Sequence, residues 1–254
     1  MKAHAKANVF LKLTGFDERN YHILSSRFVL LDEIYDEIEL TKDKKREGFE
    51  IISEFQCQNN LIAKAHALLC ECGFANTLNE CFKDYAVKLN KRIPLCAGLG
   101  GGSTDAACFL ILINESLNLG LSREKLMQIG FKLGSDVPFF LSGFKSANVS
   151  GTGEIIAEFM DEISPLNFTF SQCECLSASV YAEFDKGEFD FHKNAKFAEE
   201  FEKKSSKELL NAYENTLLND LFAPCVRLYP TMSAFLEQGF FLSGSGSAVF
   251  KVGK

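Results

Sequence analysis

Four glycines within five residues, Gly98-Leu99-Gly100-Gly101-Gly102, constrain this chain more than any other feature. Without a Cβ, the backbone there can adopt positive φ and approach another group closely. The segment 106–113 that follows is nearly apolar all round, which predicts a buried helix. Free amides and the positive end of the helix dipole meet at such a helix start, and together they bind phosphate. The structural alternative is a tight turn packed against another helix.

The glycine run matches neither of two common nucleotide-binding motifs. No Gly-Lys-Ser/Thr follows it, as a Walker A loop requires. A dinucleotide fingerprint would need a third glycine where Ser103 stands. Ser103 and Thr104 instead offer hydroxyls that can contact phosphate. The sequence therefore predicts a phosphate site of another type.

Composition limits the partners of the chain. Its 254 residues include 27 basic and 34 acidic side chains, a formal charge of −7, which disfavours a general nucleic-acid binder. No apolar run approaches the ~20 residues that span a bilayer, so no membrane partner is expected. The nine cysteines and four histidines show no metal-ligand spacing, so no protein metal site is expected. Nine free thiols suit a reducing cytosol, which predicts a cytoplasmic protein.

Hydrophobic periodicity predicts strands and helices in an irregular order. Strands are expected at 5–13, around 34–40 and at 84–93, and a hairpin at 239–250. Helices are expected at 59–73, from Ser122 to Gly134, and in the charged stretch 195–214. Because strands and helices do not alternate with a regular βαβ period, an α+β fold is favoured. The Gly- and Ser-rich stretch 143–153 predicts a domain boundary.

At the glycine run the sequence resembles the GHMP kinases, whose central motif reads Pro-x-x-x-Gly-Leu-Gly followed by small residues. Further segments with this resemblance are Ala5-Lys6-Ala7-Asn8, Asn20-Tyr21-His22, Gly134-Ser135-Asp136-Val137-Pro138, Leu218-Asn219-Asp220-Leu221 and Gly244-Ser245-Gly246-Ser247. The resemblance spans nearly the whole chain in the family's order. It implies a two-domain α+β architecture with the active site in the cleft between domains. An ATP-binding domain is expected at 1–145 and a substrate domain at 146–254.

The resemblance also implies an activity, and it is closest to the branch that uses a cytidyl substrate. The expected reaction is ATP-dependent phosphorylation, with Mg²⁺, of the 2-hydroxyl of 4-diphosphocytidyl-2-C-methyl-D-erythritol, in the non-mevalonate route to isoprenoids. Asp136 matches the family's catalytic aspartate, which accepts the hydroxyl proton or orients the hydroxyl. Lys6 matches the catalytic lysine, whose charge offsets that of the transferred group. Each residue alone also reads as an ordinary turn aspartate or strand lysine.

Binding residues carry over in the same way. The nucleotide-binding residues implied are Asn60, Lys91, Pro94, Leu95, Cys96, Ala97, Gly98, Leu99, Gly100, Gly101, Gly102, Ser103 and Thr104. The substrate-binding residues implied are Asn8, Tyr21, His22 and Tyr181. A tyrosine ring can stack on a pyrimidine and an imidazole can bond its edge. Plainer interpretations stay open: Asn60 as a helix cap, Lys91 as a surface charge, and Tyr181 as a core residue.

Two other functions are compatible with the glycine run. One is another kinase of the superfamily, for homoserine, mevalonate or galactose, against which the Tyr21-His22 pair argues. The other is a non-catalytic nucleotide-binding protein on the same fold. That alternative predicts the loss of Lys6 or Asp136, and both are present.

Overall fold

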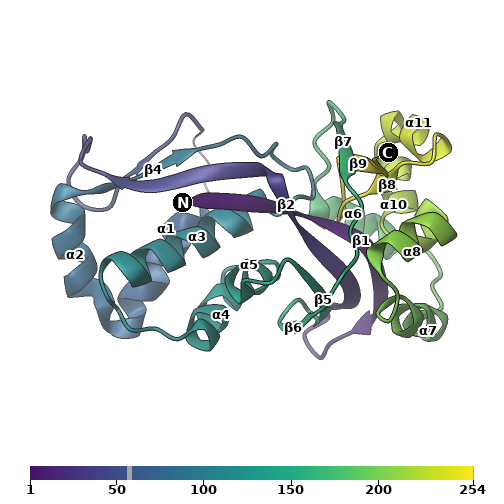
Figure 1. The fold of residues 1–254 in the computed structure, drawn as a ribbon, viewed down its shortest axis with the longest axis horizontal. Helices are drawn as coiled ribbons and strands as arrows, with labels where there is room; N and C mark the ends of the chain where they lie inside the picture. Colours follow the sequence, from purple (N-terminus) through teal and green to yellow (C-terminus); the bar gives the residue numbers. More distant parts are fainter. Residues whose placement is uncertain (56–58, 254) are drawn as a thin grey trace. The chain divides into compact units, whose positions relative to one another are not determined.

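The computed structural model describes residues 1–55 and 59–253, which form two compact units. Unit 1 comprises Met1–Ala5, Leu31–Ile93 and Gly100–Gly143, and unit 2 comprises Lys6–Leu30, Pro94–Leu99 and Phe144–Lys254. Two long strands, β1 (Lys2–Phe16) and β2 (His22–Thr41), contribute residues to both units. Each unit combines helices with strands (Figure 1), so the α+β class is confirmed. The division into domains 1–145 and 146–254 stays a prediction.

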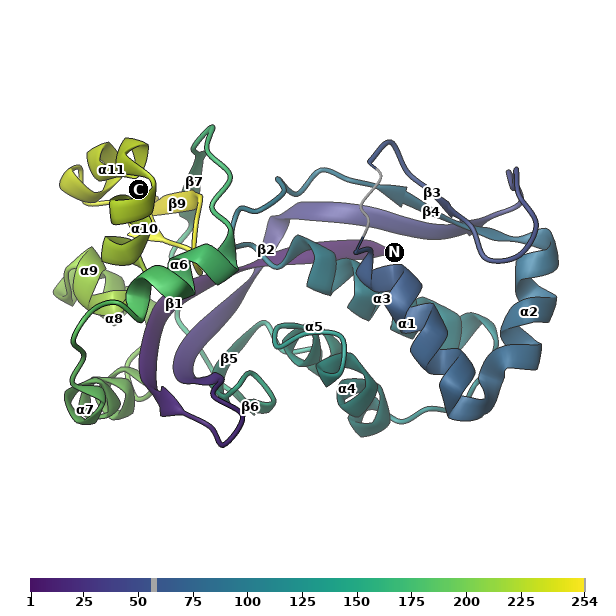
Figure 2. The ribbon, with the colours of Figure 1, turned by 180° about the vertical axis from the view of Figure 1, so that it is seen from behind.

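The sheet of unit 1 is built on the C-terminal part of β2. Strand β4 (Ala86–Asn90) pairs antiparallel with it, with Ile38 opposite Leu89, and β3 (Ile51–Ile52) pairs parallel with β4. The strands expected around 34–40 and 84–93 are therefore confirmed. The helices of unit 1 all lie on one side of β2 and β4 (Figure 2). That side carries the apolar residues of each strand, because alternate side chains of a strand point the same way.

The helices of unit 1 are α1 (Leu61–Leu69), a π-helical segment (Cys70–Phe74), α2 (Ala75–Asp84), α3 (Gly101–Ser116), α4 (Arg123–Phe131) and α5 (Val137–Ser142). Gly73 has φ 99° and interrupts the helix, so the expected helix end at Gly73 is confirmed; a further helix, α2, begins directly after it and was not predicted. Ser122 caps α4 as predicted, since its side chain accepts from the amide of Lys125. That helix ends at Phe131, before Gly134.

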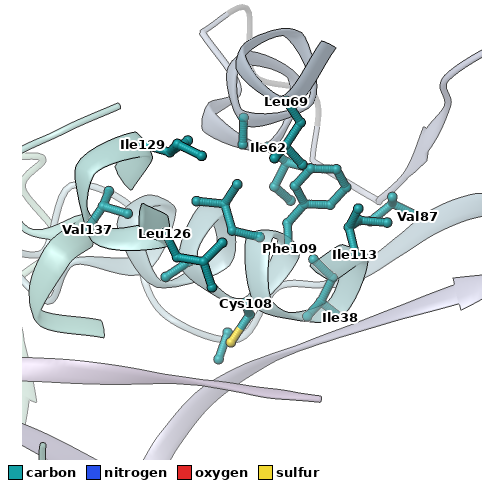
Figure 3. Packing of buried hydrophobic residues seen from close by; sticks show 14 of the residues in the cluster. Ile38, Ile62, Leu69, Val87, Cys108, Phe109, Ile113, Leu126, Ile129 and Val137 are labelled. Atoms are coloured by element: carbon teal, nitrogen blue, oxygen red, sulfur yellow. The ribbon is translucent and has the colours of Figure 1, made fainter. Parts of the chain in front are cut away.

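Helix α3 is the centre of the unit 1 core. Phe109 and Ile113 of α3 pack with Ile62 of α1 and with Leu126 of α4 (Figure 3). All of these side chains are almost fully buried. The prediction of a buried helix after the glycine run is confirmed, and its first turn is held in place by a packed core.

In unit 2, β5 (Ser146–Gly151) pairs antiparallel with the N-terminal part of β2, and β6 (Ile155–Glu158) pairs with β5. The stretch 143–153 thus contains a sheet strand, which the sequence did not predict. A second sheet has the order β7 (Leu166–Phe170), β9 (Ala248–Val252), β8 (Phe241–Leu242). Strands β8 and β9 are antiparallel, which confirms the expected hairpin at 239–250.

Short helices complete unit 2. They are α6 (Ser177–Phe184), α7 (Phe191–Phe201), α8 (Ser206–Ala212), α9 (Asn215–Leu218), α10 (Phe222–Leu228), a 3₁₀ turn (Pro230–Met232) and α11 (Ser233–Glu237). The charged stretch 195–214 is helical but divided, because Ser205 and Glu208 form a capping box that starts α8 afresh. Within the described ranges, no helix is long and apolar enough to cross a membrane.

Candidate active site

The glycine run leads into the N-terminus of α3 in unit 1, as expected. Gly100 stands at the N-cap with φ 71°, and its carbonyl accepts the amide of Thr104 at 2.9 Å. The amides of the first turn have no partner within the helix and face the same way as the positive end of its dipole. A Cβ added at Gly101 would lie 3.1 Å from Ile93 and 3.4 Å from Lys91 Nζ. A larger residue there would therefore press on the Ile93 side chain.

Lys91 is not a surface charge. Its Nζ donates to Asp36 Oδ2 at 2.5 Å and to Asp105 Oδ2 at 2.8 Å, and its side chain is 7% exposed. Burial alone would lower the pKa of Lys91, but the two carboxylates outweigh it and raise that pKa above its ordinary value. Lys91 therefore stays charged beneath the first turn of α3, and its contact with a nucleotide stays a prediction.

Asn60 caps α1 beside the glycine run. Its Oδ1 accepts the amide of Ile62 at 2.9 Å, so the cap interpretation is confirmed. A Cβ added at Gly102 would lie 3.8 Å from Leu61, which places the start of α1 against the first turn of α3. The side-chain nitrogen of Asn60 takes no part in this cap. The binding of the nucleotide by Asn60 stays a prediction.

Asp136 stands at the N-cap of α5 and is half-buried. Its side chain makes no capping hydrogen bond to that helix. The turn before it lies beside the glycine run, because a Cβ added at Gly134 would be 3.9 Å from Ser103 Oγ. Unit 1 thus places the turn that precedes Asp136 beside the first turn of α3, and the catalytic role of Asp136 stays a prediction.

The other limb of the glycine run, 94–99, belongs to unit 2 and pairs with the C-terminal turn 243–247. The carbonyls of Cys96 and Ala97 accept the amides of Ser247 (3.2 Å) and Ala248 (3.1 Å). The carbonyl of Gly98 accepts Ser243 Oγ at 3.0 Å. The two distant glycine-containing segments of the resemblance, 98–102 and 244–247, therefore meet through backbone contacts at Gly98.

Lys6 is held in the same place. Its amide donates to the carbonyl of Leu99 at 3.0 Å, and its Nζ donates to Asn8 Oδ1 (2.6 Å) and to the carbonyl of Gly98 (3.1 Å). The ammonium also lies 4.6 Å from the centre of the Phe28 ring, and Lys6 is only 3% exposed. Lys6 and Asn8 share one face of β1, because side chains two residues apart in a strand point the same way. A buried ammonium held by several acceptors is oriented, which a catalytic cation requires.

Two residues that position this turn were given no role by sequence reasoning. Asn219 Nδ2 donates to the carbonyls of Leu242 and Gly244, both at 2.9 Å. Asp220 accepts from buried Lys12 Nζ and, at 2.8 Å, from the amide of Leu13. The Asn-Asp pair between leucines therefore ties β1 to the C-terminal turn. The available signal was two adjacent polar residues in an otherwise apolar segment.

Of the residues expected at the cytidine end, His22 and Tyr181 lie close together in unit 2. Tyr21 lies in the turn between β1 and β2, is 63% exposed, and has the Arg19 guanidinium carbon 5.2 Å from the centre of its ring; its stacking on a base stays a prediction. The His22 ring lies 5.0 Å from that of Tyr181 on α6 and 4.6 Å from that of Phe16. Its Nε2 is 2.7 Å from Asp185 Oδ1, a partner that sequence reasoning missed.

The chain is similar in sequence and in fold to known proteins. A sequence model described as the GHMP kinases N terminal domain matches residues 60–144. A 4-diphosphocytidyl-2-C-methyl-D-erythritol kinase from Campylobacter jejuni (strain 81-176) is 57% identical over 99% of both chains. One from Sulfurimonas denitrificans is 41% identical over 99% of this chain and 96% of its own. A crystal structure of 4-(cytidine 5'-diphospho)-2C-methyl-D-erythritol kinase has a TM-score of 0.75 at 26% identity, covering 100% of this chain and 90% of the other.

The fold and the glycine-lined helix end define a small-molecule kinase of the GHMP class, a class that uses ATP. Within it, the chain belongs to the 4-diphosphocytidyl-2-C-methyl-D-erythritol kinase family. The predicted fold class and resemblance are confirmed. The roles of the individual site residues stay predictions.

Proposed function

We propose that this chain transfers the γ-phosphoryl group of ATP to the 2-hydroxyl of 4-diphosphocytidyl-2-C-methyl-D-erythritol, a step of isoprenoid precursor synthesis. The observation that carries the proposal is the 57% identity over 99% of both chains with a kinase of that name. The glycine-lined start of α3, with Ser103 beside the turn of Asp136, supports the phosphoryl-transfer half of the proposal. The exposed Tyr21 beside His22 supports the cytidine half.

In the proposed reaction the protein contributes little covalent chemistry of its own. The substrate oxygen attacks the γ-phosphorus, the bond to the β,γ-bridging oxygen breaks, and ADP leaves. The hydroxyl proton passes to the Asp136 carboxylate as the oxygen attacks. Lys6 places a fixed positive charge where the transferred group carries negative charge, and the amides at the start of α3 hold the phosphates. Positioning and electrostatics supply most of the rate enhancement in such transfers.

Mg²⁺ is proposed as the companion of ATP. In phosphoryl transfer, substrate phosphates and water supply many of its ligands, so a full protein cage is not needed. Among residues 1–55 and 59–253, no group of three or more His, Cys, Asp or Glu side chains could hold a metal by itself. Mg²⁺ would neutralise phosphate charge when bound. Turnover should be lost on chelation with EDTA and restored by excess Mg²⁺.

A cytosolic location is part of the proposal. All eight cysteines that the structure describes are free. Cys175 Sγ lies 3.7 Å from Cys173 Sγ and 3.6 Å from Cys225 Sγ without a bond, as expected where thiols are kept reduced.

The test is ADP release by the purified chain with ATP and Mg²⁺. Four acceptors are compared: the cytidyl substrate, homoserine, mevalonate and galactose. Turnover confined to the cytidyl substrate is expected. Turnover on another acceptor would contradict the substrate assignment but not the kinase, and no turnover on any would favour a non-catalytic nucleotide-binding protein.

The catalytic assignment has its own variant. Asp136→Ala should lower kcat by roughly 10²-fold or more, because a general base contributes about that much. ATP binding should change less than threefold, since the phosphate amides belong to α3. Asp43→Ala, which removes an exposed carboxylate of the same unit, is the matched control and should keep full turnover. Near-normal kcat in Asp136→Ala would remove this residue from the mechanism.

A further inference from the structure

Three charged side chains form a buried triad beneath the first turn of α3. Lys91 Nζ donates to Asp36 and to Asp105, and the side chains of Lys91, Asp36 and Asp105 are 7%, 0% and 5% exposed. Two carboxylates and one ammonium give the triad a net charge of −1 when all three are ionised. The reaction described above needs no such charge near the phosphates, where it opposes the binding of another anion.

The two carboxylates of the triad are not equivalent. Asp36 Oδ1 accepts the amides of Arg92 (2.5 Å) and Ile93 (2.8 Å), so both oxygens of Asp36 are engaged. Asp105 Oδ1 is buried and has no hydrogen-bond partner within the described residues. An unpartnered charged oxygen is costly to bury. Burial therefore raises the pKa of Asp105 to about 7, opposed by Lys91 and assisted by Asp36.

Other groups near Asp105 do not compete for the same proton. The Cys108 thiol, one turn further along α3, is kept neutral because burial and the Asp105 charge raise its pKa to about 12. Thr104 offers only a hydroxyl. The Met1 amino group donates to the carbonyl of Ile38 at 2.6 Å and acts on Cys108 as a nearby positive charge. It is present unchanged in every variant used below.

We infer that Asp105 takes up a proton when a nucleotide phosphate binds at the N-terminus of α3. The inference rests on the proposed function, which places ATP there. A Cβ added at Gly101 would lie 3.4 Å from Lys91 Nζ, so the triad lies directly under the turn whose amides hold the phosphate. Asp105 belongs to the start of the same helix. Protonation at Oδ1 removes the unpartnered negative charge just when an anion arrives.

The size of the effect follows from electrostatics. One negative charge about 8 Å away, at an effective dielectric constant of about 20, raises a carboxyl pKa by roughly 1.5. From about 7 in the free protein, the protonated fraction of Asp105 at pH 8 would rise from roughly a tenth to roughly three quarters. Each nucleotide bound at pH 8 should therefore take up about 0.7 proton. By the same linkage, affinity should fall about tenfold from pH 7 to pH 9.

Isothermal titration calorimetry with MgATP measures the number of protons taken up for each nucleotide bound. Tris and HEPES absorb different heats when they give up a proton. The difference in binding heat between titrations at pH 8 in the two buffers therefore gives the number of protons taken up. The wild-type protein should take up about 0.7 proton, and Asp105→Asn, which keeps the shape of the neutral acid, close to none. Asp43→Asn makes the same charge change at an exposed site of unit 1 and should behave as wild type.

A second measurement needs only the wild-type protein. Its proton uptake should be largest near pH 8 and fall toward zero by pH 6, where Asp105 is already protonated in the free protein. Uptake that persists in Asp105→Asn, or that is absent from the wild type, would overturn the inference while leaving ATP binding intact. No binding of MgATP by any of these proteins would overturn the proposed function, and this inference with it.

Discussion

Replacing Gly98 by alanine tests how the glycine run is held in unit 2. A Cβ at position 98 would lie 2.1 Å from the carbonyl oxygen of Ser243 and 3.1 Å from the amide nitrogen of Gly246. Both are backbone atoms, so no side chain can rotate away to make room. Either the limb 94–99 or the turn 243–247 must move, and the hydrogen bonds between them must change.

Two costs add up in Gly98→Ala. The left-handed φ of 71° costs a residue with a Cβ about 1–2 kcal/mol. Forcing an extra methyl into packed atoms costs a further 1–3 kcal/mol or so. The expected loss is therefore about 2–5 kcal/mol. Gly239→Ala is the matched control, because Gly239 has φ 73° but a Cβ there would meet nothing within 4 Å. It should show the first cost alone.

Urea unfolding, compared by midpoint, measures the difference between the two variants. With a slope of about 3 kcal/mol/M, an excess loss of 1–3 kcal/mol lowers the midpoint of Gly98→Ala by roughly 0.3–1 M more than that of Gly239→Ala. The KM for ATP should rise at least tenfold in Gly98→Ala only, because the glycine run, which we propose binds the phosphates, is displaced. Equal midpoints and equal KM values in the two variants would refute the reasoning.

Two further predictions concern unit 2. Tyr21→Ala should raise the KM for the cytidyl substrate about tenfold or more, since a base stacked on an aromatic ring is worth about 1–3 kcal/mol; Tyr21→Phe should keep the wild-type value, and an unchanged KM in the alanine variant would exclude stacking. Asp220→Ala should cost about 3–5 kcal/mol in thermal or urea unfolding, because it leaves Lys12 buried at 3% exposure without its carboxylate. The double variant Lys12→Met/Asp220→Leu should recover only part of that loss, because it removes the buried charge but leaves the amide of Leu13 without its acceptor. A loss below about 1 kcal/mol in Asp220→Ala would contradict a paired buried charge.

The sequence predicted the helices and strands that depend on periodicity and on nearby capping residues. The alternation at 5–13 lies within β1, the cap at Ser122 starts α4, and the apolar stripe after the glycine run became the central helix. These features depend on backbone periodicity and on side chains a few residues apart.

Tertiary context decided the elements that were missed. Strand β5 has the sequence Ser-Ala-Asn-Val-Ser-Gly, which lacks strand propensity and reads as a loop. It is a strand because β2 lies on one side and β6 on the other. Gly73 ends the first helix as predicted, because its φ of 99° is left-handed, but a second helix, α2, starts directly after it and was not predicted.

The sequence predicts the charged side chains expected in the site, but it does not show the backbone contacts that hold them. Lys6 and Asp136 were predicted because the chemistry needs their charges. Two of the bonds that hold Lys6 in place end on the carbonyls of Gly98 and Leu99, which any residue possesses, so a single sequence leaves no trace of these two. The sequence does show the glycines that a close contact between two backbone segments requires. Gly98 and Gly244 both have positive φ, and a Cβ at Gly244 would lie 3.1 Å from the carbonyl of Gly98. Two distant glycine motifs are thus the readable sign of one backbone contact, and a substitution at either one should disturb the same phosphate loop.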